Sequence, residues 1–123
     1  MAERIVSPNL IDIVEAIDRI RASLTGLSLE DFENSWEKCW LVERGIEIIS
    51  EASRRLPGDL KDRNPGIPWR KVAGIGNIIR HDYERVAPDV LWKLIQDDLP
   101  TLEKVCRAEL SAALAREQEE GEG

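Results

Sequence analysis

The amino-acid sequence predicts an all-α protein, a compact bundle of four to five helices, on three observations. Apolar residues recur at spacings of three and four along most of the 123-residue chain, which is the period of amphipathic helices. Proline, glycine and helix-capping residues interrupt this pattern, as they do at turns between helices. No segment alternates between apolar and polar residues for long enough to predict a strand.

The first two helices are expected to form a hairpin. The first starts at Ser7, with Pro8 at a favourable first helical position, and the turn TGLS ends it. Ser28, with Asp31 three residues later, resembles a capping box that starts a second, long helix. The buried positions of the first helix are Leu10, Ile13, Val14, Ile17, Ile20 and Leu24. The apolar stripe of the second is Leu29, Phe32, Trp36, Cys39, Trp40, Ile46, Ile49 and Leu56.

Three further helices are expected in the second half of the chain. The segment 56–68, LPGDLKDRNPGIP, has three prolines and two glycines, so it is predicted to be an irregular connection. A third helix starts at Pro68, a short one runs from about Pro88 to Gln96, and a final one begins at DDLPTLEK. The buried side of the final helix is predicted to hold Leu99, Leu102, Val105, Cys106, Leu110 and Leu114.

Length and composition predict one domain over residues 1–115, followed by an acidic disordered tail over 116–123. The tail, REQEEGEG, has no apolar residue with which to dock. No run of 18 apolar residues exists and the N-terminus does not resemble a signal peptide, so we expect a cytoplasmic protein without a membrane segment. Cys39 and Cys106 lie in apolar helical patterns, which favours buried thiols over a disulfide.

The net charge of −7 argues against nucleic-acid binding over the whole surface, because phosphates bind basic surfaces. Its distribution is uneven. The segment 63–86 has five basic and two acidic residues, a local charge of +3. This uneven distribution weakens the objection to nucleic-acid binding.

One face of the third helix is predicted to be exposed and polar. At 100° per residue, Val72, Ile75 and Ile79 share one side of this helix. The opposite side holds Arg70, Gly74, Asn77 and His81, the only histidine of the chain. Each glycine inside a helix costs about 1 kcal/mol relative to alanine. Gly74 and Gly76 therefore predict close helix packing or the close approach of a partner.

The order of elements and three stretches, IISEASRRLP, IPWRKVAGIGN and RHDYERVAPDVLW, resemble the HepT-like family of the HEPN superfamily of helical nucleases. The likeness covers about residues 5 to 107. It implies a HEPN-like helical bundle that forms a homodimer and acts as an RNA-cleaving toxin. It also implies a nucleotidyltransferase antitoxin, which silences the toxin by attaching AMP to a tyrosine.

The family motif reads Arg, four residues, His, any residue, Tyr, with a polar residue usually after the Arg. His81 and Tyr83 match its last two positions and Asn77 matches the polar one, whereas Gly76 stands in place of the arginine. Arg80, one helical turn later, is expected to compensate. The resemblance thus implies Arg80 and His81 as catalytic residues and Tyr83 as the site of AMPylation. Asn77 and Arg70 are expected to support them.

The chemistry implied is metal-independent cleavage of single-stranded RNA. Histidine suits the proton transfers because its unperturbed pKa is about 6.5, and arginine suits the phosphate. A symmetric dimer supplies a second copy of each group. One histidine and two distant cysteines do not make a usual zinc site, so no metal or other cofactor is expected.

Two alternatives stay open at this point. Without the motif arginine the protein is instead a catalytically inactive helical dimer that binds, or is modified by, a partner nucleotidyltransferase. The other alternative concerns Trp36 and Trp40, whose spacing within an apolar stripe favours core or dimer interface over base stacking. Packing is likewise favoured over ligand contact for Trp69, and Trp92 is expected in the core.

Overall fold

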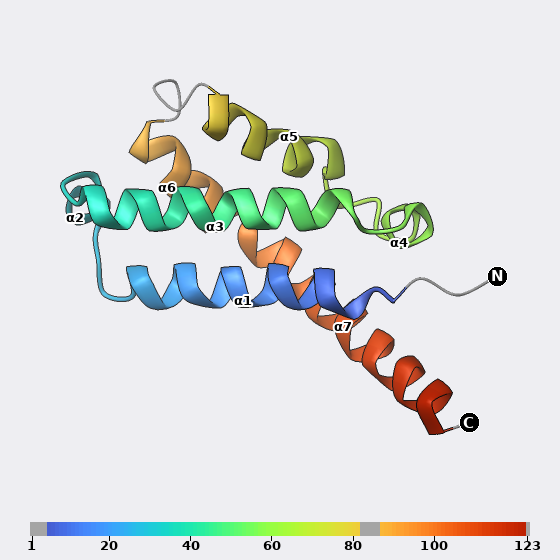
Figure 1. The fold of residues 1–123 in the computed structure, drawn as a ribbon. Coiled ribbons are helices and arrows are strands. Elements are labelled where there is room, and N and C mark those ends of the chain that lie inside the picture. Colours follow the sequence, from blue (N-terminus) through green and yellow to red (C-terminus); the bar gives the residue numbers. More distant parts are fainter. Residues whose placement is uncertain (1–4, 82–86, 123) are drawn as a thin grey trace.

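The structure is a computed structural model that describes residues 5–81 and 87–122, and every described element is a helix (Figure 1). The helices are α1 (Ser7–Leu24), α2 (Leu29–Glu33), α3 (Trp36–Arg54), α4 (Gly58–Asp62), α5 (Trp69–His81), α6 (Pro88–Asp97) and α7 (Leu99–Glu122). The five longer helices correspond to the five predicted from the sequence. This confirms the all-α fold class, with two short helices added.

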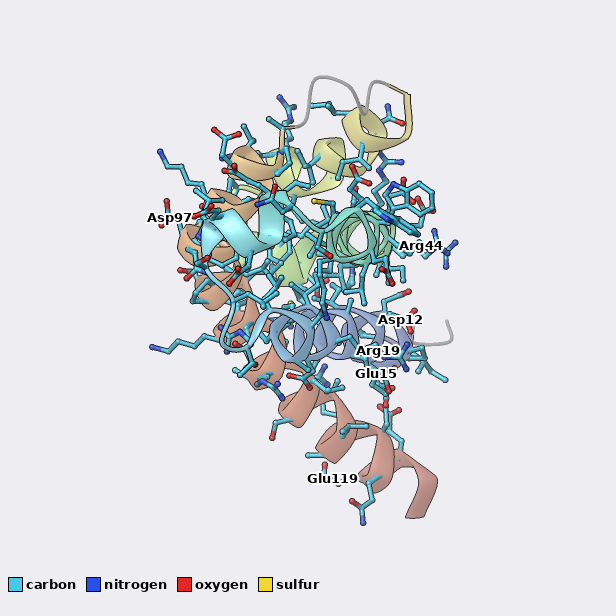
Figure 2. All side chains as sticks on the ribbon, turned by 90° about the vertical axis from the view of Figure 1, so that its left-hand side faces the viewer. Asp12, Glu15, Arg19, Arg44, Asp97 and Glu119 are labelled. Carbon is cyan, nitrogen blue, oxygen red and sulfur yellow. The ribbon has the colours of Figure 1, made fainter. Side chains whose placement is uncertain are left out.

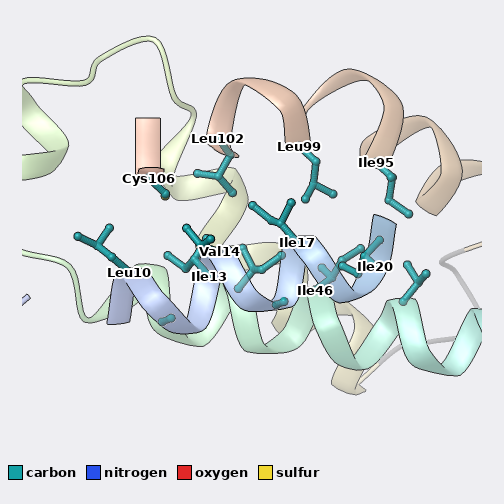
Figure 3. Close-up of a cluster of buried hydrophobic side chains, with 14 of the residues drawn as sticks. Leu10, Ile13, Val14, Ile17, Ile20, Ile46, Ile95, Leu99, Leu102 and Cys106 are labelled. Atoms are coloured by element: carbon teal, nitrogen blue, oxygen red, sulfur yellow. The ribbon is translucent and has the colours of Figure 1, made fainter. Parts of the chain in front are cut away.

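The core is built on an antiparallel hairpin of α1 and α3, with α7 packed across α1 (Figure 1). All six predicted apolar positions of α1 are buried. Figure 3 shows several of them facing Leu99, Leu102 and Cys106 of α7. The hairpin is tight because Gly45 of α3 has no side chain: a Cβ there would lie 2.8 Å from Cδ1 of Ile20. Glycine at this position lets the two backbones approach closely.

The predicted long second helix is divided into two. The capping box is confirmed, since Ser28 Oγ accepts from the Asp31 N–H at 3.1 Å and Asp31 Oδ2 accepts from the Ser28 N–H at 3.0 Å. It starts only the five-residue α2, however. Ser35 is extended and caps α3 by accepting from the Lys38 N–H at 3.2 Å. A second capping serine therefore restarts the helix, which the continuous apolar spacing concealed.

The connection between α3 and α5 is less irregular than predicted. It contains α4, whose Leu60 is buried in the core. Pro68 precedes α5 as expected, and its carbonyl accepts the Val72 N–H at 3.0 Å. On α5, Ile79 is buried and Val72 and Ile75 are half-buried, which confirms the predicted inner face of this helix.

The end of α7 differs from the expectation. Helix continues to Glu122, whereas disorder was predicted from residue 116. Glu117 Oε1 accepts the Ser7 N–H at 3.4 Å, so this acidic residue supports the start of α1. The buried residue in this part of α7 is Ala113 rather than Leu114, which is 47% exposed.

A polar contact joins Glu109 of α7 to Arg63 and Asn64, the two residues that follow α4. This contact is expected to make the stability of the fold depend on pH. Glu109 accepts two hydrogen bonds from Arg63, at 2.8 and 3.2 Å, and one from Asn64 at 2.9 Å. The Arg63 hydrogen bond is the main cause that lowers the Glu109 pKa below its usual value. A lowered pKa stabilises the fold above the unfolded-state pKa, and this contribution is lost as the pH falls through the folded-state pKa.

We therefore expect Glu109→Gln to lower the free energy of unfolding by about 1 kcal/mol at pH 7. The expected loss is no larger because Arg63 is half-exposed, so solvent weakens its interaction with Glu109. The difference from the parent should shrink between pH 7 and pH 3, because Glu109 gains a proton as the pH falls toward and through its folded-state pKa. Urea unfolding followed by circular dichroism at the two pH values measures it. Glu119→Gln, at an exposed position on α7, is the control. An equal deficit at both pH values would show that charge is not the cause.

Candidate active site

Helix α5 lies on α3 through a contact that leaves no room for a side chain at Gly76. A Cβ at this position would lie 2.6 Å from both Cβ and Oγ of Ser50, closer than real Cβ atoms approach. Glu47 is also near, with its Cα 3.6 Å from the same point. The motif position that the family fills with arginine therefore faces the neighbouring helix in this protein. Of the two explanations for Gly76, close helix packing is confirmed.

Hydrogen bonds from α3 fix the position of α5 along this contact. The buried hydroxyl of Ser50 donates to the Ala73 carbonyl at 2.6 Å and accepts the Gly76 N–H at 3.3 Å. Arg54 Nη2 donates to the same Ala73 carbonyl at 2.8 Å. Because these bonds involve the α5 backbone, they set the register of the helix independently of its side chains.

The outer face of α5 is open where the sequence predicted it. Arg70 and Asn77 are both exposed. A Cβ on Gly74 would meet nothing within 4 Å, so helix packing does not explain this glycine. The backbone stays helical through His81. The side chains of Arg80 and His81, and the whole of Tyr83, lie outside the described part of the chain.

One carboxyl group with a shifted pKa, that of Glu43 on α3, was not predicted from the sequence. Glu43 lies one turn before Glu47 on the same face of α3, and α5 runs antiparallel to α3 (Figure 1). Burial raises the pKa of Glu43, and the neighbouring Glu47 adds to the effect. Such a carboxyl holds a proton to higher pH than an exposed one. No sequence signal marks it, because glutamates four apart are typical of a solvated helix face.

Two basic residues of the positively charged segment 63–86 form ion pairs with carboxylates. Arg63 pairs with Glu109 at 2.8 Å, and Lys71 Nζ lies 3.6 Å from Asp98 Oδ2. Among the described basic residues of this segment, Arg70 is the one on the outer face of α5.

The four tryptophans divide into packed and exposed pairs. Trp92 contacts Phe32 with ring centroids 5.6 Å apart, and Trp69 Nε1 donates to the Asn64 carbonyl at 3.0 Å. These contacts confirm packing roles for both. Trp36 and Trp40 are 63% and 65% exposed and contact each other edge to face, at 4.9 Å between centroids. The prediction that they belong to the core is wrong, whereas the dimer-interface alternative stays a prediction.

A small apolar pocket lies under the N-terminal half of α5. Its lining includes Ile49, Ile67, Val72, Ile75 and Leu102, and its volume is about 130 Å³. The Lys71–Asp98 ion pair lies at this pocket and neutralises its main charges. Within residues 5–81 and 87–122, no three His, Cys, Asp or Glu side chains are grouped to hold a metal ion.

Comparison with known proteins identifies the family. The family model described as "Ribonuclease HepT-like" matches residues 13–109, which include α5 and the positions of its motif. The chain belongs to the HepT-like ribonuclease family. This confirms the resemblance drawn from the sequence and agrees with the helical fold.

Relatives within the HepT-like family carry ribonuclease names. "Probable ribonuclease HepT" of Thermococcus cleftensis is 40% identical over 93 residues, which cover 76% of this chain and 84% of the relative. "Putative RNase MJ1380" of Methanocaldococcus jannaschii is 32% identical over 104 residues, covering 85% and 95%. No solved structure matches the chain significantly. In the described part of this HepT-like chain, no helix is both long and apolar enough to span a membrane.

Proposed function

We propose that this protein is a metal-independent endonuclease of single-stranded RNA, acting through the outer face of α5. Two observations together support this proposal. The chain belongs to the HepT-like family, and the open face of α5 presents Arg70, Asn77 and the position of His81. RNA that is single-stranded has splayed phosphates and bases, which allows it to enter a narrow site that excludes a duplex.

The cleavage uses the RNA's own 2′-hydroxyl as nucleophile. One His81 takes the proton from the 2′-OH, whose oxygen attacks the adjacent phosphorus. The bond from phosphorus to the 5′-oxygen breaks, and a protonated His81 from a second copy donates its proton to that oxygen. The products are a 2′,3′-cyclic phosphate and a 5′-hydroxyl, so atoms and charge balance without a metal ion.

Positive charge near the phosphorus stabilises the transition state. Arg80 is proposed to bind the phosphate oxygens in place of the arginine that Gly76 excludes. Asn77 donates a hydrogen bond to the same phosphate, and Arg70, two turns earlier on the helix, binds a neighbouring phosphate. Glu43 is proposed to hold His81 in the protonation state needed for each step.

The cellular role proposed is that of a cytoplasmic toxin in a toxin–antitoxin pair. The antitoxin is a nucleotidyltransferase that attaches AMP to Tyr83: the phenol oxygen attacks the α-phosphorus of ATP and pyrophosphate leaves. Tyr83 is two residues from His81, so an AMP group there adds negative charge and bulk beside the site. RNA is then repelled.

One observation supports a second candidate, a helical dimer without catalysis that binds or is modified by the nucleotidyltransferase. Gly76 stands in place of the motif arginine. Its packing against Ser50 leaves no space for an arginine side chain at this position. If Arg80 does not replace it, the phosphate loses its main ligand.

Cleavage of a mixed-sequence RNA by the purified, mass-verified unmodified protein in EDTA distinguishes the two candidates. We expect cleavage by the parent and losses of about 100-fold or more in His81→Ala and Arg80→Ala, the usual effects of removing a general acid–base or a charge-stabilising group. Arg116→Ala, at an exposed arginine on α7, is the matched control and should cleave like the parent. Absence of cleavage by a folded, dimeric parent would favour the non-catalytic candidate.

A further inference from the structure

The apolar pocket under α5 lies on the opposite side of this helix from the candidate active site. Val72 and Ile75 line it from the inner face of α5, whereas Arg70 and Asn77 are exposed on the outer face. The rest of its lining comes from α3, α6, α7 and the connections beside them. Its volume of about 130 Å³ is close to that of an apolar cavity of roughly 150 Å³ that holds benzene in another protein. The pocket is therefore large enough for a small organic guest.

Among the residues that line this pocket, the polar side chains lie at its opening. Most of the lining side chains are those of isoleucine, leucine, valine and proline. The polar ones are Lys71, Asp98 and Thr101, and all three residues are exposed to solvent. Lys71 Nζ lies 3.6 Å from Asp98 Oδ2. The pocket thus combines an apolar interior with one positive and one negative charge, side by side, at its opening.

The Lys71–Asp98 ion pair can be rearranged at little cost. Exposed ion pairs add little to stability, because water screens their attraction and the side chains lose freedom when they pair. The side chains of Lys71 and Asp98 are 66% and 48% exposed, and their separation is long for a hydrogen bond between an ammonium and a carboxylate. A ligand that offers each of them a closer partner therefore competes easily with this contact.

The two charges at the opening select a ligand that has both charges itself. A carboxylate without an amine would bind Lys71 but would also lie beside the like charge of Asp98. An amine without a carboxylate would bind Asp98 but would lie beside Lys71. In an α-amino acid the carboxylate, the ammonium and the side chain share one carbon atom. When its two charges face their opposites at the opening, its side chain is free to enter the apolar interior.

We propose that this pocket binds a free α-amino acid whose apolar side chain is about the size of leucine's. Its carboxylate pairs with Lys71, its ammonium pairs with Asp98, and its side chain packs against Val72 and Ile75. Within the described chain α5 packs chiefly on α3, whereas the bound side chain also contacts the pocket residues of α6 and α7. Binding is thus expected to hold α5 against these two helices. The proposal does not depend on the nuclease function.

Isothermal titration calorimetry of the full-length protein with L-leucine tests the proposal. Two comparison compounds each lack one charge: 4-methylpentanoate has no amine, and 3-methylbutylamine has no carboxylate. We expect L-leucine to bind at least tenfold more tightly than either, and to raise the midpoint of thermal unfolding. L-Alanine has both charges but leaves most of the pocket empty, so it should bind at least tenfold more weakly than L-leucine.

Two substitutions at the opening are expected to change which compound binds best. Lys71→Gln should weaken L-leucine binding about tenfold and make the protein prefer the amine to the acid, because Asp98 has then lost its competing partner. Asp98→Asn should also weaken L-leucine binding, but should make the protein prefer the acid. Both positions are exposed, so both variants are expected to fold like the parent, which circular dichroism checks.

The matched controls are neighbouring charges that do not line the pocket. Asp97→Asn changes the adjacent aspartate, which Figure 2 shows at the outer edge of the molecule, and Lys93→Gln changes an exposed lysine of α6. Both should bind L-leucine like the parent. Absence of binding by the parent, equal affinity for the three compounds, or an unchanged order of preference in Lys71→Gln and Asp98→Asn would each overturn the proposal. RNA cleavage enters none of these outcomes, so their failure leaves the proposed function untouched.

Discussion

Gly76→Arg, which restores the residue of the family motif, is expected to lower the free energy of unfolding by about 3 kcal/mol and not to increase RNA cleavage. The first added atom would lie 2.6 Å from two atoms of Ser50, so α5 has to move away from α3. Overpacking of this kind costs about 1–3 kcal/mol, and the movement also strains the hydrogen bonds of Ser50 to the α5 backbone. Urea unfolding and the EDTA cleavage assay measure the two effects.

Gly74→Ala is the matched control for this prediction. It lies in the same helix, two residues away, and its added methyl group would meet nothing within 4 Å. Removing a helical glycine there should raise the free energy of unfolding by about 0.5–1 kcal/mol. A Gly76→Arg variant as stable as the parent would show that α5 does not pack on Ser50 as described. A more active variant would show that the missing arginine, and not Arg80, limits cleavage.

Phe32→Ala is expected to lower the free energy of unfolding by about 4 kcal/mol. Phe32 is fully buried and contacts Trp92 of α6, with ring centroids 5.6 Å apart. Truncating a buried phenylalanine costs about 3–5 kcal/mol through lost burial and the cavity left behind. The five-residue α2 is too short to be stable alone, so it depends on this contact. The result is a large part of the 5–15 kcal/mol that stabilises a typical domain.

Chemical unfolding monitored by circular dichroism gives this value directly. Leu114→Ala removes a similar apolar volume from α7 at a position that is 47% exposed, and it should change stability by about 0.5 kcal/mol at most. If Phe32→Ala and Leu114→Ala lower the free energy of unfolding by the same amount, burial of Phe32 is not the cause of the loss of stability. A loss of below about 1 kcal/mol in Phe32→Ala would show that α2 and α6 are not joined through this ring.

Much of the fold could be predicted because helical periodicity reports which residues a helix buries. The start of α1 at Ser7, the capping box at Ser28 and the helix after Pro68 all follow from local chemistry, and the structure agrees. The break at Ser35 was missed because the apolar spacing runs through it. Leu114 was misplaced because its spacing fits the stripe of α7, although at this point of the helix the buried residue is Ala113.

The candidate site could be predicted only in part from the sequence. Asn77 and Arg70 were placed on the outer face of α5, where the structure has them. The raised pKa of Glu43 was not predicted, because it depends on burial by packing that no local pattern reveals. Arg63 was counted in the local charge of +3 of residues 63–86, but it binds Glu109, 46 residues away in the chain.

The order of apolar and capping residues was thus enough to predict the five longer helices and most of their inner faces, since each depends on neighbours within a turn or two. The exposure of Trp36 and Trp40, the steric limit at Gly76 and the raised pKa of Glu43 depend instead on which helix lies against each side of α3. A residue's spacing shows which side of its helix it occupies. Whether another helix, solvent or a second copy covers that side is set by packing between segments distant in sequence.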